Sequence, residues 1–340
     1  PPSITKAKLA DMRERFGADW PITRIVEDTL EMALATLPKL KEKFEEPGKF
    51  LMIQAEEITD KYDGNPIHVN ATNLLELILP QGGNSTHDVL QRNINAVYKQ
   101  REETGQGMLA HVNHPNFGWG IVAENLIELR GDTFFEVYNG HPAVRNWGDD
   151  AHPGTDRMWD IVLAMRLHQG LGPLFGLAVD DTHDYYKHKI GKSNPGRGWV
   201  MVKAQALNAE NIIASLEKGN FYSTTGVILK DIQINDRALT IHIKEKTDVA
   251  YRTQFIGTPK QFDTSSKPVL NSMGEPAHIT RVYSNEIGQV FSETTENPAV
   301  FSFTGAEMYV RAKIISDQLQ DNPFAEGDLE TAWTQPVLIK

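Results

Sequence analysis

The sequence predicts an α/β protein in two parts, a mainly parallel sheet or barrel followed by an antiparallel β-sandwich, with the boundary near residue 226. Two observations lead to this fold class. Between residues 50 and 218, short apolar runs alternate with segments of helical periodicity. After residue 226, short and often alternating runs are separated by turn residues, with no helical pattern between them. A chain of 340 residues is long enough for one large domain or for two.

The elements of the first part follow in order from these patterns. Residues 5–46 carry apolar side chains at helical spacing, punctuated by Pro38 and Pro47, and predict helices. Two strands come next, and then strands and helices alternate. We expect strands at 50–59, 67–71, 108–112, 133–138, 174–179 and 199–204, and helices at 87–103, 121–129, 155–168 and 208–218. In such folds the chemistry lies at the C-terminal ends of the strands.

The second part, 227–340, consists of strands only. Its short runs lie at 232–234, 239–243, 253–256, 281–283, 300–303 and 309–312. Runs of this length, separated by turn residues, are typical of an antiparallel β-sandwich.

The composition excludes several classes of function. The chain has no cysteine, which rules out thiolate catalysis, cysteine-bound zinc and disulfides. Its net charge of −11 argues against a nucleic-acid-binding surface. No stretch approaches the ~20 apolar residues of a membrane span, and the start at Pro1 has no signal-peptide pattern. Oligomeric state and compartment, cytoplasmic or exported, stay open.

A candidate metal site begins with Asp181-Thr182-His183, directly after the apolar run 174–179. In an extended segment, residues i and i+2 point the same way, so Asp181 and His183 are expected to converge. Imidazole and carboxylate ligands together suit zinc, manganese or iron. The alternative is an ordinary Asp–His hydrogen bond in a loop.

Further candidate ligands lie at earlier strand ends, and nine of the eleven histidines fall between His68 and His188. Glu57 and His68 each end or occupy a predicted strand, and a bridging carboxylate such as Glu57 would suit a multinuclear site. Each also has a structural interpretation, as an ion-paired carboxylate or a hydrogen-bonded imidazole. His111 and His114 share one segment, where one is expected to be structural, and Pro115 favours His114 as the positioned ligand.

Three more positions have candidate roles around this site. Glu136, at the end of a strand, is expected to orient a liganding histidine, and His141 to contact substrate or cap a loop. A local basic cluster follows the Asp-x-His segment and contains Arg197, our candidate for holding phosphate oxygens, and the lysines 187, 189 and 192. A solvated loop is the alternative for each lysine.

The order of these motifs resembles the PHP family, the polymerase and histidinol phosphatase domain. The motifs are Glu57-Ile58-Thr59, His68, His114-Pro115-Asn116, Glu136 to Gly140 and Asp181-x-His183. The resemblance spans about residues 50–226 and implies a distorted (β/α)7 barrel with two or three metal ions. Later segments, 221–226 and 309–336, resemble the long members that carry a C-terminal β-domain.

The resemblance also implies a role for each matching residue. Glu57 would bridge two metal ions, His68 and His114 would bind one of them, Asp181 would bind the second and His183 a third. Glu136 would lie at the edge of the site. The family opens with a His-x-His strand, whereas no histidine precedes His68 here. We therefore expect a barrel without its first two strands, either in a chain that lost its N-terminal portion, which we favour, or in a degenerate relative of the family.

These inferences predict a metal-dependent phosphoesterase acting on a small phosphorylated substrate. Metal-activated water would attack the ester, with Glu57 and Asp181 as catalytic metal ligands and Arg197 and His141 as substrate contacts. The cofactors would be zinc, manganese or iron. Two alternatives remain: a non-catalytic protein that binds carbohydrate or a surface polymer, and a metal-dependent hydrolase of a non-phosphate bond.

Overall fold

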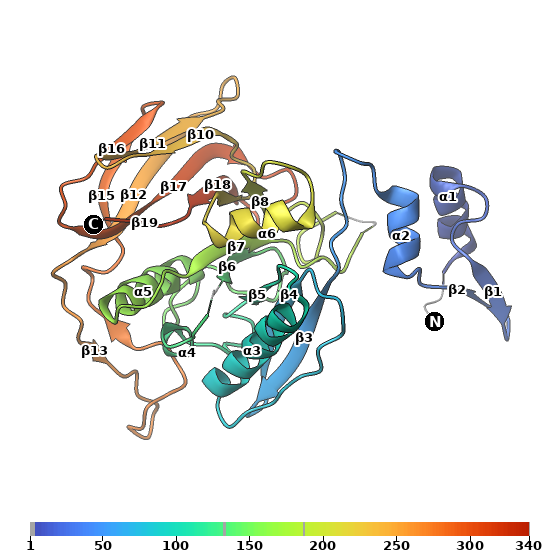
Figure 1. Cartoon of the computed structure of the whole chain (residues 1–340), viewed down its shortest axis with the longest axis horizontal. Coiled ribbons are helices and arrows are strands. Elements are labelled where there is room, and N and C mark those ends of the chain that lie inside the picture. The colour runs from blue at the N-terminus through green and yellow to red at the C-terminus, as the bar shows by residue number, and fades with distance from the viewer. Residues whose placement is uncertain (1–3, 132–133, 186–187, 340) are drawn as a thin grey trace. The chain divides into compact units, whose positions relative to one another are not determined.

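The computed structural model describes residues 4–131, 134–185 and 188–339. Within them the chain is a mixed α/β protein with six helices and several sheets (Figure 1). It divides into two compact units, residues 1–54 with 206–208, and residues 55–205 with 209–340. Lys187 and the first residue of the strand expected at 133–138 lie outside the described residues. In the described part, no helix combines the length and apolar character needed to cross a bilayer.

The first unit contains two helices and a hairpin, α1 (Lys6–Phe16), β1 (Thr23–Val26), β2 (Thr29–Met32) and α2 (Leu37–Phe44). The prediction of helices throughout 5–46 is therefore wrong at its centre. Glu27 and Asp28 both have positive φ, +44° and +62°, which is the backbone of a tight hairpin turn. The turn pairs Ile25 with Leu30 across the hairpin and interrupts the helical pattern.

The second unit is built on a five-stranded sheet in the order β3-β4-β5-β6-β7. Its strands are β3 (Ala55–Tyr62), β4 (Asn65–Thr72), β5 (Leu109–Val112), β6 (Phe134–Asn139) and β7 (Phe175–Val179). Only β5, β6 and β7 run parallel. β3, β4 and β5 are antiparallel, because Asp63 and Gly64 form a two-residue turn that joins β3 directly to β4. The expected mainly parallel arrangement thus holds for three strands of five.

Helices connect these strands, and both faces of the sheet are covered. They are α3 (Thr86–Thr104), α4 (Ala123–Ile127) and α5 (Thr155–His168), while α6 (Ala209–Glu217) follows later. Val112 and Val137 point into one core cluster, and Leu109, Phe134 and Leu177 into the other. Burial on both faces explains why these strands read as continuous apolar runs. Among the described residues β3 and β7 do not pair, so the sheet is not a closed barrel.

The remaining strands form mostly antiparallel sheets. A three-stranded sheet contains β10 (Leu229–Ile234), β11 (Ala238–Ile243) and β16 (Ala299–Ser302). A larger sheet has the order β15-β12-β17-β18-β9-β8, with β19 beside β17. Its strands are β8 (Trp199–Val202), β9 (Phe221–Thr224), β12 (Tyr251–Pro259), β15 (Gln289–Thr294), β17 (Glu307–Leu319), β18 (Leu329–Thr334) and β19 (Val337–Leu338). A short pair, β13 (Ser266–Lys267) and β14 (Val282–Tyr283), lies apart.

The three-stranded and the larger sheet share one hydrophobic core, in which Leu239 and Ile241 of β11 join Phe255 of β12 and Val310 of β17. The strand expected at 199–204 belongs to the larger sheet. β8 pairs antiparallel with β9 and does not extend the β5–β7 sheet. Strands on both sides of residue 226 thus share a sheet, and the predicted domain boundary there stays a prediction.

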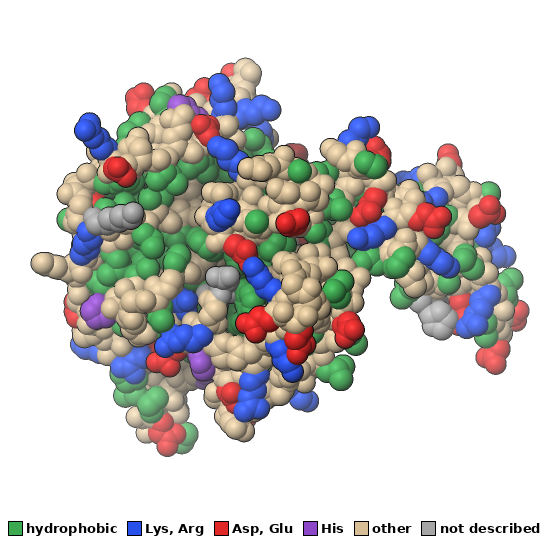
Figure 2. Space-filling model, viewed as in Figure 1, with side chains coloured by type: hydrophobic (Ala, Val, Ile, Leu, Met, Phe, Trp, Pro, Cys, Tyr) green, Lys and Arg blue, Asp and Glu red, His purple; other side chains and the backbone are tan. Residues whose placement is uncertain are grey.

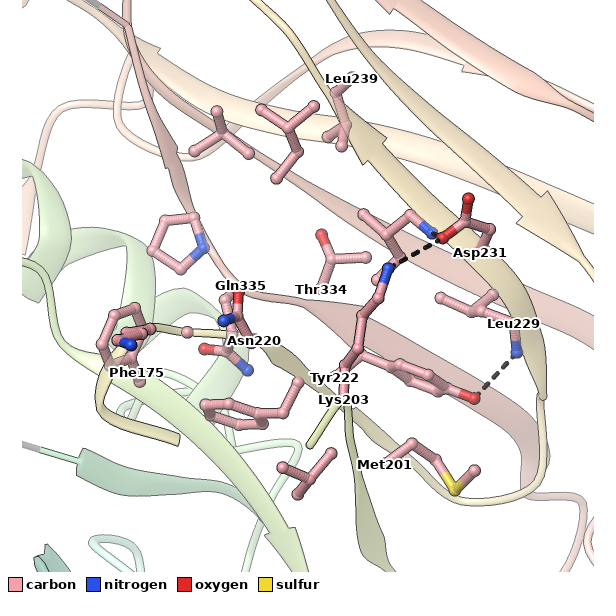
Figure 3. Close-up of a pocket in the computed structure, with 18 of the residues that line it drawn as sticks. Phe175, Met201, Lys203, Asn220, Tyr222, Leu229, Asp231, Leu239, Thr334 and Gln335 are labelled. Carbon is pink, nitrogen blue, oxygen red and sulfur yellow. Dashed lines mark hydrogen bonds and ion pairs between the residues drawn. The ribbon is translucent and has the colours of Figure 1, made fainter. Parts of the chain in front are cut away.

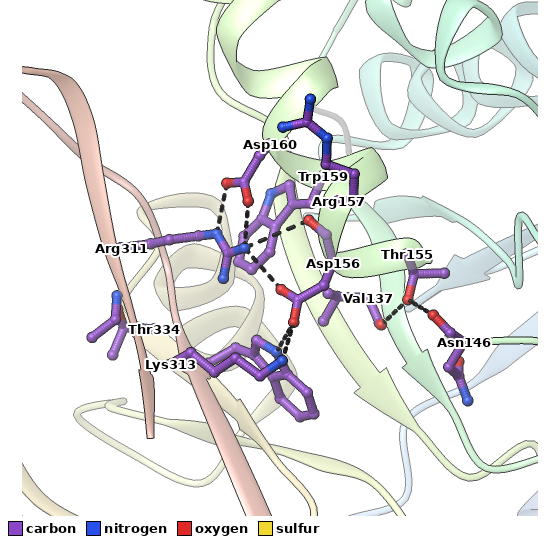
Figure 4. Close-up of polar contacts among 12 residues, drawn as sticks. Val137, Asn146, Thr155, Asp156, Arg157, Trp159, Asp160, Arg311, Lys313 and Thr334 are labelled. Carbon is purple, nitrogen blue, oxygen red and sulfur yellow. Dashed lines mark hydrogen bonds and ion pairs between the residues drawn. The ribbon is translucent and has the colours of Figure 1, made fainter. Parts of the chain in front are cut away.

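The larger sheet is tied to α5 by buried charges. Arg311 of β17 donates to Asp156 and Asp160 of α5, at 2.8 and 2.7 Å (Figure 4). Tyr309 and Trp333 join the core that covers the five-stranded sheet. The five-stranded sheet and the β-rich region are therefore packed together as one unit through α5.

Candidate functional site

Three side chains from neighbouring strands meet beside the five-stranded sheet. Glu57 lies on β3, His68 on β4 and His114 just after β5. Thr59 lies opposite His68 in the antiparallel β3–β4 pair, so Glu57, two residues earlier, projects from the same face as His68. The Asn113 backbone N–H donates to the His68 carbonyl oxygen at 3.1 Å and holds the chain after β5 against β4. The register of three strands thus brings His114 to the other two residues.

The two imidazoles converge on one carboxylate. Glu57 Oε1 lies 3.1 Å from His68 Nδ1 and 3.7 Å from His114 Nε2, and the ring centroids are 5.0 Å apart. Each of the three residues offers one atom that could bind a metal ion, and these three atoms all lie within 4.8 Å of one another. The described residues contain no second group of this kind. The Glu57 side chain is 41% exposed and that of His114 6%. The carboxylate therefore faces solvent while the protein holds the imidazoles.

The electrostatics of the group favour an ionised carboxylate. The imidazoles of His114 and then His68 hold the pKa of Glu57 well below its usual range, against the effect of burial. Burial by itself lowers the pKa of His114. The carboxylate of Glu57 and the charges of Glu136 and Asp181 outweigh it and raise the pKa overall. A cation at this position would therefore compete with a proton on His114.

A layer of buried polar side chains holds His114 in position. Glu136 Oε2 accepts the His114 backbone N–H at 2.8 Å and Asn139 Nδ2 at 2.8 Å. Glu136 Oε1 lies 3.2 Å from His111 Nε2. Burial alone would raise the pKa of Glu136, but the hydrogen bond and charge of His111 and the charge of His114 lower it. Glu136 thus positions the main chain of His114, and His111 belongs to this supporting layer.

Asp181 joins this layer through Asn139, whose Nδ2 lies 3.2 Å from Asp181 Oδ2. Asp181 and His183 do lie close together, with His183 Nδ1 3.6 Å from Asp181 Oδ1, but not through the expected extended backbone, because β7 ends at Val179 and Asp181 has a φ of +47°. His183 Nδ1 lies 2.9 Å from the Asp181 carbonyl oxygen, and its side chain is 65% exposed. The i, i+2 rule applies to extended backbone only. Neither residue is brought into the Glu57 group.

His141 lies near both sets of residues. Its ring centroid is 5.3 Å from that of His183 and 6.3 Å from that of Phe117. The Phe117 ring in turn lies 5.0 Å from His114. Burial lowers the pKa of His141 and favours the neutral imidazole, whose Nδ1 accepts the Ala143 backbone N–H at 3.1 Å.

Arg197, expected to hold phosphate, is buried and hydrogen-bonded to the backbone. Its Nη1 donates to the Gly140 carbonyl oxygen at 2.8 Å and its Nη2 to that of Lys189 at 3.0 Å. A Cβ at Gly140 would lie 2.7 Å from the Arg197 Cβ, so only glycine permits this packing. Arg197 therefore fixes Gly140, the residue before His141, against the loop that follows β7. Because both of its Nη atoms donate to backbone carbonyl oxygens, they are not available to a substrate in this arrangement.

Sequence reasoning missed the residues that connect the candidate ligands. Asn113 Nδ2 donates to Glu57 Oε1 at 2.8 Å, Asn139 bridges Glu136 and Asp181, and the Phe117 ring lies beside three imidazoles. Asn113 and Asn139 are adjacent to, or within, the strand-end motifs. In the sequence, these residues could have been found as asparagines next to candidate metal ligands.

Comparisons with protein-family models, with curated proteins and with solved structures gave no match. What can be said about the chemistry of the Glu57 group therefore comes from the group's own geometry.

Proposed function

We propose that this chain is a metal-dependent hydrolase in which Glu57, His68 and His114 hold a divalent cation. The observation that carries the proposal is the convergence of one carboxylate oxygen and two imidazole nitrogens, all within 4.8 Å of one another. Two histidines and one carboxylate are a recurrent ligand set for zinc at hydrolytic sites and for iron at open ones.

The residues present fit such an ion. The Glu57 carboxylate is ionised, since its pKa is lowered, and no lysine or arginine pairs with it in the ion pairs of the described residues. Three ligands leave positions on the ion for substrate and solvent, and the exposure of Glu57 keeps that side accessible. The donor set suits zinc, manganese or iron. A cation bound there would supply Lewis acidity and lower the pKa of water.

The surrounding residues have separable tasks in this proposal. Glu136 and Asn113 orient His114 and Glu57 by hydrogen bonds, as groups behind metal ligands commonly do. His141 would contact the substrate and, with its Nδ1 accepting the Ala143 N–H, would present Nε2–H to it as a hydrogen-bond donor. Arg197 positions His141 through its bond to Gly140.

The finer assignment follows the PHP resemblance. It adds two points to the proposal, a phosphate ester as substrate and one or two further metal ions bound through Asp181 and His183. It also interprets the five-stranded sheet as part of a distorted barrel and residues 227–340 as a β-sandwich domain. Support for the phosphate ester comes from the resemblance alone, whereas the cation is supported by the geometry of the Glu57 group.

The test measures bound metal and hydrolysis together. Purified protein would be stripped with a chelator, reloaded with zinc, manganese or iron(II), and analysed for metal by mass spectrometry. Each loaded form would then be assayed on p-nitrophenyl phosphate, bis(p-nitrophenyl) phosphate and p-nitrophenyl acetate. We expect retained metal and turnover of a phosphate ester, both lost in His68→Gln.

His168→Gln is the matched control, because His168 ends α5 and is not part of the Glu57 group. It should keep both metal and activity. Equal metal content in His68→Gln and wild type would refute the site. Metal retention with turnover of the acetate only would replace phosphoester hydrolysis with hydrolysis of a non-phosphate bond. Metal retention without any turnover would favour a binding protein.

A further inference from the structure

A cavity, separate from the Glu57 group, opens between the edges of the three-stranded sheet and the larger sheet. It has a volume of about 610 Å³, within the range of pockets that enclose small organic ligands. β8 and β10 each form the edge of their own sheet, and both line the cavity (Figure 3). Phe175 also lines it, at the start of β7, whereas Asp181 follows the opposite end of that strand.

The interior of the cavity is apolar. Its walls include Phe175, Phe221, Tyr222, Leu229, Ile232 and Leu239. Figure 2 shows hydrophobic side chains gathered in the region of β18 and β19, two elements that also line the cavity. Burial of this surface against an apolar ligand is favourable, since it removes carbon from water.

Three polar side chains in the wall already have partners within the protein. The Tyr222 hydroxyl accepts the Leu229 N–H at 2.9 Å. The Gln335 side-chain amide exchanges two hydrogen bonds with the Gly176 backbone, at 3.0 and 2.9 Å. The Thr334 hydroxyl accepts the Ala312 N–H at 2.8 Å. The inner wall therefore offers mainly apolar contacts to a ligand.

The charges around the cavity have the opposite sign to the chain as a whole. Lys203, Lys218 and Lys230 line it with a single carboxylate, Asp231, in a protein of net charge −11. All three lysines are exposed. Lys203 Nζ lies 3.5 Å from Asp231 Oδ1 and its side chain is 83% exposed, so this pair is weak. An anionic group near these lysines would be attracted, and a cationic one repelled.

We propose that this cavity binds a small amphipathic anion, with its apolar body between the sheet edges and its anionic group at the lysines. The proposal is independent of the metal site, because none of the lining residues belongs to the Glu57 group. Carboxylates and phosphates share the required chemistry, and the experiment separates them.

The test is titration calorimetry of the whole chain, after chelator treatment, with dodecanoate, dodecyl phosphate and dodecyltrimethylammonium. We expect saturable binding of at least one anion, a negative heat-capacity change and no binding of the cation. Which anion binds more tightly identifies the head group. Added salt should weaken binding of the anion, because the lysines are solvent-exposed.

Met201→Glu places a carboxylate on β8 at the cavity, and it should weaken anion binding by at least about tenfold. Val290→Glu is the matched control, since Met201 and Val290 lie on the two opposite edge strands of one sheet and are 38% and 48% exposed. It should bind as wild type does. If Met201→Glu does not fold, Asn220→Trp fills part of the same cavity from an exposed position and should likewise weaken binding by at least about tenfold.

Three results would overturn the proposal. The first is the absence of saturable binding by either anion, and the second is equal affinity for the cation. The third comes from light scattering. If wild type self-associates and Met201→Glu is monomeric while Val290→Glu is not, a second copy of the chain covers the cavity.

Discussion

Two carboxylates in this protein, each within its own cluster of polar side chains, share one property and differ in another. Glu57 and Asp156 both have carboxyl pKa values well below the ordinary range. The partners of Glu57 are two imidazoles and the Asn113 amide. Those of Asp156 are the permanent cations Arg311 and Lys313 and the Trp333 indole.

The difference lies in what the partners leave open. Burial by itself would raise the pKa of Asp156, but the charges of Lys313 and Arg311 together outweigh it and lower the pKa. Each partner of Asp156 is a hydrogen-bond donor. Arg311 is 1% exposed and Asp160 completes its neutralisation (Figure 4). An imidazole, in contrast, can give up its proton and present a lone pair. The Asp156 cluster is thus closed to a further cation, whereas the Glu57 cluster can exchange a proton for one.

A lowered carboxyl pKa therefore does not by itself distinguish a binding site from a structural ion pair. The chemistry of the partners and the access of solvent make the distinction.

The largest effect is expected from Arg311→Leu. It leaves Asp160 buried without its cation and Asp156 with Lys313 alone, and it should destabilise the protein by about 3–5 kcal/mol. Urea unfolding followed by circular dichroism would measure it. Arg252→Leu, which breaks the exposed pair with Glu293, should cost less than about 1 kcal/mol. Equal losses in the two variants would contradict a buried structural clamp.

Zinc should stabilise the wild-type fold through the Glu57 cluster only. At a free zinc concentration of one hundred times Kd, linkage predicts about 2.7 kcal/mol. Glu57→Gln should abolish this gain, while Asp156→Asn, although less stable at the start, should keep it. The readout is the urea midpoint with and without zinc. A zinc response that disappears in Asp156→Asn but persists in Glu57→Gln would invert our assignment of the two clusters.

Asn113→Ala should weaken zinc binding about tenfold, or about 1.4 kcal/mol, because Asn113 Nδ2 donates to Glu57 Oε1. Competition with a fluorescent zinc chelator would measure the affinity. Asn93→Ala is a suitable control, since Asn93 donates to Asp60 and Val89 and not to the cluster. Equal affinities in wild type and Asn113→Ala would remove Asn113 from the site.

Acid should weaken the Asp156 cluster gradually. A carboxyl whose folded-state pKa is lowered contributes stability that is complete above its unfolded pKa of about 3.9 and is lost as pH falls towards the folded value. The contribution of Asp156 to the pH dependence of the free energy of unfolding cannot exceed about 1.4 kcal/mol per pH unit. We expect Asp156→Asn to lose stability less steeply than wild type between pH 5 and pH 3 in urea unfolding. Parallel curves would show that Asp156 titrates alike in the folded and unfolded states.

Local patterns predicted much of the fold and part of the site. The helices α3 and α5 and the strands β5, β6 and β7 lie within a few residues of their expected ranges, because continuous apolar runs and helical spacing are local signals. Glu57, His68 and His114 were singled out from strand ends and do meet. Asp181, His183 and Arg197 were singled out by the same reasoning and do not join that group.

The misplaced residues have physical explanations. Asp181 lies beyond the end of β7 with a left-handed backbone, which no strand rule describes. Arg197 has the charge to bind phosphate, but its guanidinium meets the carbonyl oxygens of Gly140 and Lys189. Those carbonyls belong to separate loops, so the contact depends on tertiary packing.

Local sequence patterns specify most elements from β3 onward, the acidic charge, the absence of cysteine and three side chains able to bind a cation. Which carboxylates are neutralised and which remain accessible depends on tertiary packing. Asp156 and Arg311 are separated by more than 150 residues and are joined by the packing of α5 on β17. Glu57 and His114 meet through the register of three strands. Hydrophobic periodicity encodes each segment locally, whereas the partner of a charge is set by contacts between segments that are distant in sequence.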